Sequence, residues 1–221
     1  MPVLNGEQLQ LALERFNLAI WPAQMVAFAL GGAALMLVLR GGRRASLGTA
    51  AILAGFWLAV AAFEAFWLPA PGGPALAALS VVQAAVLCAE ALRGRLVFGL
   101  PTRAAGAVGL GLVACALVAY PAVAALADLE FPRVPPFGLA PGPVALFTFG
   151  LLVLTVRPVR ARAMVVPLLT AAACTGAAAS GLAPEWTLLP AALAAVAALG
   201  IRSRRRAQTL HAHRRAGANL T

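Results

Sequence analysis

Seven long apolar runs, separated by short segments rich in arginine, proline or glycine, are the main pattern along the chain. A helix that crosses a bilayer needs about 20 largely apolar residues, each adding about 1.5 Å of rise. Every run approaches this length and therefore predicts one membrane-spanning helix. The predicted helices cover residues 18–39, 47–68, 75–92, 104–127, 139–156, 163–182 and 186–201.

The fifth and seventh runs, 139–156 and 186–201, fit this length least well, because each is short or carries prolines near its start. Six spans plus one interfacial or re-entrant segment is therefore an alternative to seven spans. With either count, the pattern favours an all-α fold, a polytopic transmembrane helical bundle.

An amphipathic segment precedes the first run. Its apolar positions share one helical face, at Leu9, Leu13, Phe16 and Ile20. We therefore expect residues 1–17 to form a helical lead-in on the outer membrane surface, and the chain to enter the membrane near Trp21. Residues 18–201 then form a single transmembrane domain, and residues 202–221 a flexible basic tail in the cytoplasm.

The composition fits a protein whose solvent is lipid. Hydrophobic residues make up 62% of the 221 residues and charged residues 11%, against about 45–50% apolar and about 25% charged in ordinary soluble domains. Too few polar residues remain to cover a surface that faces water. We expect a multi-pass protein of the inner (plasma) membrane.

The basic residues other than histidine are all arginines, and their distribution indicates the orientation of the helices. Fifteen of the 17 fall in connections on one side of the predicted bundle or in the tail, and the other side has Arg15 and Arg133. Five of the seven acids share the side of these two: Glu7, Glu14, Asp128, Glu130 and Glu185. The positive-inside rule then places the arginine-rich side in the cytoplasm and the amino terminus outside, which requires an odd number of crossings.

The net charge of +10 bears on possible partners. Arginines in short connections form no basic face with interleaved aromatic residues, so we expect no nucleic-acid partner. We expect anionic lipid at the arginine-rich cytoplasmic face instead. Small residues four apart, such as Ala107 and Gly111, also allow a membrane protein partner or a homo-oligomer.

Few groups in the predicted spans carry chemistry. The spans contain neither histidine nor lysine, so they offer no bis-histidine haem ligation and no retinal Schiff base. Cys88, Cys115 and Cys174 belong to no disulfide or metal-ligand pattern. We expect no cofactor, no metal and no catalytic residue, which makes a membrane enzyme the least favoured function.

Two acids lie inside predicted spans, where a carboxylate costs about 3 kcal/mol and marks a candidate functional position. Glu90 is near the cytoplasmic end of its span, three residues before Arg93, so a helical ion pair or snorkelling to the interface accounts for it. Glu64 lies about 6 Å of helix inside the outer end of its span, and no basic residue falls within a turn of it. We interpret Glu64 as a candidate proton or cation site; the alternative is a carboxylate that reaches headgroup water.

Other polar or conformationally special residues fall in the same outer half as Glu64. Together they predict an outward-facing pocket lined by Asn17, Trp21, Gln24, Glu64, Gln83, Phe137, Gly138, Pro141, Pro143 and Thr148. Four of these belong to the connection 130–143, which is too rich in proline to be helical throughout. It folds over the outer end as a lid or re-entrant turn, or else forms a rigid turn.

Two stretches, 16–24 (FNLAIWPAQ) and 137–150 (FGLAPGP through FTFG), resemble a bacterial membrane family, the domain-of-unknown-function 6064 family. That family has an aromatic-Asn pair followed by Trp-Pro-x-Gln, and later a Phe-Gly-x-x-Pro-Cys-Pro element. Gly142 stands where this cysteine would be, which argues against thiol or metal chemistry at the element. The resemblance covers nearly the whole chain and implies a polytopic membrane fold without an established activity.

Two functional hypotheses follow. The first is a small transporter, channel or solute-binding protein whose polar outer half, centred on Glu64, takes a proton, a cation or a small polar ligand. The second is a noncatalytic membrane subunit or scaffold that packs against partner helices. The sequence gives the two about equal support.

Overall fold

The computed structural model describes residues 6–68, 72–127, 129, 131–178 and 183–218. Within these ranges the chain is helical, apart from turns, connections and one isolated β-bridge between Phe98 and Thr155. The expected all-α class is therefore confirmed. The acids Asp128 and Glu130, and the end of the sixth predicted helix at 179–182, lie outside the described residues.

Apart from the last helix, which continues well beyond the seventh predicted run, the apolar helices follow the predicted runs to within a few residues. They are α1 (Gly6–Ala19), α2 (Ala23–Arg40), α3 (Arg43–Phe66), α4 (Gly73–Leu92), α5 (Arg103–Ala114), η1 (Cys115–Ala119), α6 (Tyr120–Leu126), α7 (Pro141–Val153), α8 (Arg162–Ala178), η2 (Ala183–Thr187) and α9 (Leu188–Ala218). Here η1 is a π-helical turn and η2 a 3-10 turn.

Five helices of the described chain are long and apolar enough to cross a membrane. They are Ala23–Arg40, Arg43–Phe66, Gly73–Leu92, Arg103–Leu126 and Glu185–Arg204. Two further apolar helices, α7 and the apolar part of α8 (Arg162–Gly176), are shorter than 18 residues. Several helices of this length and apolarity are typical of a membrane protein.

One of the five, Arg103–Leu126, is built from α5, η1 and α6 in succession. Pro121 lies just after η1, and proline has no N–H to donate to the carbonyl four residues before it. The widened π turn at Cys115–Ala119 accommodates this missing bond without ending the helix. The helix therefore continues through Tyr120 to Leu126.

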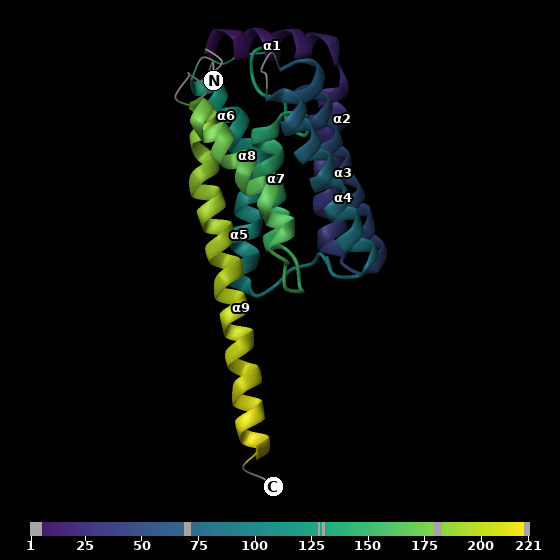
Figure 1. Cartoon of the computed structure of the whole chain (residues 1–221), viewed down its shortest axis with the longest axis vertical. Coiled ribbons are helices and arrows are strands. Elements are labelled where there is room, and N and C mark those ends of the chain that lie inside the picture. Colours follow the sequence, from purple (N-terminus) through teal and green to yellow (C-terminus); the bar gives the residue numbers. More distant parts are fainter. Residues whose placement is uncertain (1–5, 69–71, 128, 130, 179–182, 219–221) are drawn as a thin grey trace.

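The connections gather at two opposite ends of the bundle (Figure 1). At one end, Gly99 N–H donates to Leu154 O (2.9 Å) and Val156 N–H donates to Val97 O (2.8 Å), which joins the α4–α5 and α7–α8 connections. The Phe98 N–H donates to the Ser46 hydroxyl near the α2–α3 connection (3.0 Å). We call this end the arginine end, because its connections and helix ends carry Arg40, Arg43, Arg44, Arg93, Arg95, Arg103, Arg157, Arg160 and Arg162.

The opposite end is covered by α1, which lies across the ends of the other helices, and we call it the α1 end (Figure 1). Leu13 and Phe16 pack there in a second hydrophobic cluster with Phe63, Ala124 and Leu129. The amphipathic helix, described from Gly6 to Ala19, thus buries Leu13 and Phe16 against protein.

The short helix α7 is the centre of the bundle. Twelve of its 13 residues are buried, and it contacts α3, α5, α8 and α9. It connects the α1 end with the arginine end although it is too short to cross a bilayer alone. Such a helix is stable in a membrane when protein surrounds the chain on both sides of it.

The segment from residue 202, for which we expected a flexible tail, is helical in this structure as far as Ala218. It is part of α9, which continues as one helix and extends beyond the rest of the bundle at the arginine end (Figure 1). Between Arg202 and Ala216 the segment contains neither proline nor glycine, and it is rich in arginine and alanine, which are strong helix formers.

Replacing Gly150 of α7 with alanine tests its close contact with α5. A Cβ at Gly150 would lie 2.8 Å from the backbone N of Val113 and 3.0 Å from Gly109 O, so the two helices would have to separate. We expect Gly150→Ala to lower the free energy of unfolding by about 1–3 kcal/mol in detergent.

The matched control is Gly111→Ala on α5, where a Cβ would meet open space. We expect this change to leave stability unchanged or to raise it by up to about 1 kcal/mol, because alanine is the better helix former. Equal losses of stability in both variants, measured by thermal or denaturant unfolding, would contradict the packing described here.

Candidate functional site

Two of the three amide side chains of the predicted pocket, Asn17 and Gln24, form a hydrogen-bonded lock between chain segments at the α1 end. Asn17 Nδ2 donates to Pro132 O (2.6 Å) and Val134 O (2.8 Å). Gln24 Nε2 donates to the backbone O of Asn17 (2.9 Å) and to its Oδ1 (3.1 Å). These bonds fasten the α6–α7 connection to the junction of α1 and α2.

Two further contacts support this lock. Arg133 Nε donates to Glu14 Oε2 (2.9 Å) in an exposed ion pair. The ring of Trp21 lies 5.8 Å from that of Phe131, and the Trp21 side chain is 59% exposed. Trp21 therefore lies on the surface of the α1 end, apart from the buried polar groups.

The residues Phe137 and Gly138 pack into the apolar core. Phe137 lies against Phe28, Phe56 and Phe147, with ring centroids 5.0, 5.6 and 5.2 Å away. Gly138 has a φ of +76°, which favours glycine, and a Cβ there would crowd Phe56. These two residues shape the turn that leads into α7.

The two prolines of the predicted pocket begin α7. Pro141 is the first residue of the helix and Pro143 lies in its first turn. Backbone N–H groups have no intrahelical acceptor there, so the N–H that proline lacks costs no hydrogen bond. Their role in this structure is therefore to start the helix.

Thr148 and Gln83 tie helices together. Thr148 Oγ1 accepts a hydrogen bond from Trp57 Nε1 (3.1 Å) and donates to Val144 O (2.7 Å). Gln83 Nε2 donates to Ala163 O (3.0 Å), which links α4 to the start of α8. The Gln83 Oε1 atom is buried without a hydrogen-bond partner.

Glu64 is buried between α3 and α4, with 4% of its surface exposed. The Ser80 hydroxyl on α4 donates to Glu64 Oε2 (2.7 Å). A Cβ at Gly73, the first residue of α4, would overlap the backbone carbonyl oxygen of Glu64. The helices α3 and α4 therefore approach each other closely at this level. The side chain thus faces the interior of the bundle.

A second buried carboxyl, Glu185, was not among the predicted pocket residues. It lies in η2 at 4% exposure, and Tyr120 OH on α6 donates to its Oε1 (2.8 Å). Its Oε2 is buried without a hydrogen-bond partner. The sequence had assigned Glu185 to an outer connection, because the apolar run that follows it was taken to begin at Trp186.

Two features of the fold accommodate Glu185: one leaves space for its carboxyl group, and the other places a hydrogen-bond donor beside it. A Cβ at Gly142 of α7 would overlap both oxygens of its carboxyl group, so only glycine fits there with the acid in place. The π turn η1 immediately precedes Tyr120, which is 1% exposed and directs its hydroxyl to Glu185. Helical π turns are frequent at functional sites.

The two acids occupy one region of the α1 end. Cys174 lies on α8. α8 contacts α4, which carries Ser80, and η2, which carries Glu185. We call Glu64, Ser80, Tyr120, Cys174 and Glu185 the carboxyl site.

Glu90 at the arginine end has the opposite surroundings, although it is equally buried at 1% exposure. It pairs with Arg95 (3.6 Å), with Arg160 (3.8 Å) and, most closely, with Arg162. An ion pair was expected here, but the expected partner Arg93 is not among these three. In the described chain, every salt bridge involves Glu14 or Glu90, and none involves Glu64 or Glu185.

The ten predicted residues thus divide among several local arrangements, and their binding role stays a prediction. Across the described ranges, no group of three or more histidine, cysteine, aspartate or glutamate residues could hold a metal ion.

The hydrogen bond between Tyr120 and Glu185 can be tested for its effect on stability. We expect Tyr120→Phe to lower the free energy of unfolding by about 1–3 kcal/mol, because a buried carboxyl oxygen loses its donor. In a Glu185→Leu background the same change should cost less than about 0.5 kcal/mol. Identical losses in both backgrounds, measured by unfolding in detergent, would show that the bond contributes nothing.

Comparison with known proteins identifies a family. The sequence profile of a family of unknown function, DUF6064, matches residues 7–212, which is nearly the whole chain. The match agrees with the resemblance carried by residues 16–24 and 137–150. No curated protein and no solved structure matches the chain.

Proposed function

The chain belongs to DUF6064, a family of unknown function, and we propose that it is a multi-pass inner-membrane protein that binds and releases a proton at the carboxyl site. In this proposal the polypeptide crosses the membrane seven times, with α1 on the outer surface and the arginine end in the cytoplasm. The proton site then opens toward the outside, as expected for a transporter, a channel or a solute-binding protein.

The distribution of charge supports this orientation. The connections at the arginine end carry nine arginines between Arg40 and Arg162, whereas Arg15 and Arg133 lie at the α1 end. Positive residues in short connections favour the cytoplasmic side. Seven crossings also require α7 and α8 to count as spans, and the burial of α7 inside the bundle is compatible with its short length.

One observation carries the functional proposal: two carboxyls are buried at the α1 end, and no arginine among the described residues forms an ion pair with either. An ionised carboxyl in hydrocarbon without a counter-ion costs several kcal/mol, so these groups must be neutralised by another ligand. Glu90 shows the alternative solution within the same molecule, because three arginines neutralise it.

A proton suits this site better than a metal cation does. Hard cations such as Ca²⁺ and Mg²⁺ take about six oxygen ligands, whereas each carboxyl here has one hydroxyl hydrogen-bonded to it, from Ser80 or Tyr120. A proton needs only one acceptor oxygen. The hydroxyl groups can reorient to accept from a protonated carboxyl or to donate to an ionised one.

A carbodiimide that dissolves in the membrane, dicyclohexylcarbodiimide, tests this state directly. The carboxyl proton moves to a nitrogen of the reagent while the carboxyl oxygen adds to its central carbon, and the adduct rearranges to a stable N-acylurea. We expect mass spectrometry to find this label on Glu64 and Glu185 at neutral pH. Labelling should fall as the pH rises, because only the protonated carboxyl reacts.

Glu90 is the internal control, because it is at least as buried as the other two acids but is paired with arginines. We expect no label on Glu90, and Glu64→Gln should remove the label at its own position while leaving that on Glu185. Labelling of all three acids, or of none, would contradict the proposal. If Na⁺ at constant pH protected Glu64 and Glu185 from labelling, the ligand of the site would be a metal cation and not a proton.

The orientation has its own test by cysteine labelling in intact cells. In a variant whose three native cysteines are replaced by alanine, Glu7→Cys should react with a maleimide that does not cross membranes. Arg93→Cys, which is exposed at the arginine end, should react only after the membrane is opened. The reverse pattern would overturn the orientation and place the carboxyl site on the cytoplasmic side.

A noncatalytic subunit or scaffold is the second candidate, and one observation favours it. Gly111 on α5 is exposed, with open space around it, and Ala107 lies one turn before it on the same face. Small residues four apart allow a second helix to approach closely in lipid. Purification in mild detergent that returns only a lone monomer would count against this role.

A further inference from the structure

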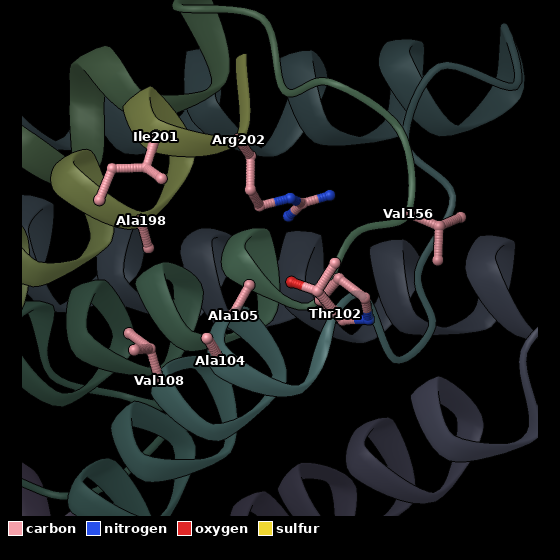
Figure 2. Close-up of a pocket in the computed structure, with 9 residues that line it drawn as sticks. Thr102, Ala104, Ala105, Val108, Val156, Ala198, Ile201 and Arg202 are labelled. Atoms are coloured by element: carbon pink, nitrogen blue, oxygen red, sulfur yellow. The ribbon is translucent and has the colours of Figure 1, made fainter. Parts of the chain in front are cut away.

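A cavity of about 360 Å³ lies between α5 and α9 at the arginine end (Figure 2). Ligand pockets in proteins commonly measure about 300–1,000 Å³. Seven of its nine lining residues are apolar, and the small side chains of Ala104, Ala105 and Ala198 leave the space open. The two polar lining residues are Thr102 and Arg202.

In the proposed membrane arrangement, on which this inference rests, the edge of this cavity faces the lipid. Ala104 is exposed on α5, and Ile201 is 52% exposed on α9. Both helices belong to segments that are long and apolar enough to cross a membrane. The cavity lies at their arginine-end limits, beside Val156 of the α7–α8 connection, and therefore at the depth of the headgroups.

The polar part of the cavity is positively charged. Figure 2 shows the guanidinium of Arg202 directed from α9 toward Thr102 and the Val156 segment. Opposite it, α5 begins at Arg103, and the N-cap residue Thr102 makes no side-chain capping bond. The amino-terminal end of a helix carries a partial positive charge, and no acidic residue lines the cavity.

The guanidinium of Arg202 is charged, and it also makes hydrogen bonds that stabilise the fold. It donates to the backbone carbonyls of Val153 (2.9 Å) and Thr155, beyond the end of α7. A guanidinium remains protonated in proteins and has five N–H donors in a planar fork that suits phosphate oxygens. The same side chain can therefore hold α7 in place and attract an anion.

We propose that this cavity binds one anionic phospholipid, with its phosphate between Arg202, Thr102 and the start of α5. One acyl chain then lies along the apolar wall between α5 and α9. The apolar lining and the opening to lipid favour a phospholipid over a soluble anion, and the absence of an acid favours a negatively charged headgroup. The lipid joins α9 to α5 at the level where the arginine-rich part of α9 leaves the bundle.

The test is lipid binding to the full-length protein in mild detergent, followed by native mass spectrometry or a fluorescence titration. Phosphatidylglycerol should bind more tightly than phosphatidylcholine with the same acyl chains. Arg202→Gln should weaken phosphatidylglycerol binding by about tenfold or more, because a charge-assisted contact to phosphate is lost. Phosphatidylcholine has the same phosphate but no net charge, so its weaker binding should fall by a smaller factor.

Arg204→Gln is the matched control for charge. It removes one arginine two residues away on the exposed surface of α9, outside the cavity lining. We expect it to weaken phosphatidylglycerol binding by less than about threefold, since each surface arginine contributes roughly 1 kcal/mol to attraction by an anionic membrane and less in detergent. Equal losses in the Arg202 and Arg204 variants would overturn a defined site.

A second pair of variants keeps the proposal testable if Arg202→Gln disturbs the fold through α7. Ala198→Leu adds volume inside the cavity, whereas Ala197→Leu adds it on the exposed face of the same helix. We expect about a tenfold loss of phosphatidylglycerol affinity for the first and no change for the second. An unchanged affinity in Ala198→Leu would overturn the acyl-chain position. If soluble glycerol phosphate bound as tightly as phosphatidylglycerol, the proposal that the ligand is a lipid would be overturned.

Discussion

A polar group without a partner costs several kcal/mol in hydrocarbon, and this cost determines how the central helix is held. α7 has 13 residues, and 12 of them are buried in protein, so the polar groups at its ends need partners from the protein. Arg202 of α9 donates to Val153 O and Thr155 O, and Gly99 donates to Leu154 O, so the carbonyls at this end are satisfied by protein. At the other end, Pro141 removes one N–H that would need a partner. A short helix can therefore occupy the centre of the bundle because its neighbours supply the hydrogen bonds that water would supply elsewhere.

The same cost separates the acids of the chain into two groups. Glu90 is buried among three arginines, which suits a permanent charge and joins the end of α4 to the start of α8. Glu64 and Glu185 are buried beside hydroxyl groups, which stabilise a carboxyl in either protonation state. This difference is what makes the carboxyl site a candidate for exchange of a proton and Glu90 a structural residue. Burial alone does not distinguish the two groups, since all three side chains are nearly inaccessible.

Much of the fold follows from apolar periodicity and arginine placement, because both reflect the thickness and polarity of the membrane. Glu64 was recognisable as a candidate because a carboxyl in a long apolar run must find a partner or reach water. The sequence left these two alternatives open, and the structure shows the side chain turned inward to Ser80. The role of Asn17 was not predictable in the same way, because its acceptors are backbone carbonyls of Pro132 and Val134, more than 100 positions later, and no side-chain pattern marks them. Glu185 was missed because it was taken for an exposed acid of an outer connection; it does precede α9, but η2 directs it inward to Tyr120 and Gly142, which are distant in sequence.

Three local features of the chain become coherent only when they are considered with Glu185. Pro121 requires a break in regular hydrogen bonding, and the π turn that meets this requirement ends where Tyr120 faces the acid. Gly142 lies in a proline-flanked helix start, where its lack of a side chain leaves the space that the carboxyl fills. In a chain with cysteine at this position, the Cβ would overlap the carboxyl, so an acid equivalent to Glu185 would have to move. Gly142 and Glu185 are therefore sterically coupled, and a relative that keeps one without the other must build this part of the α1 end differently.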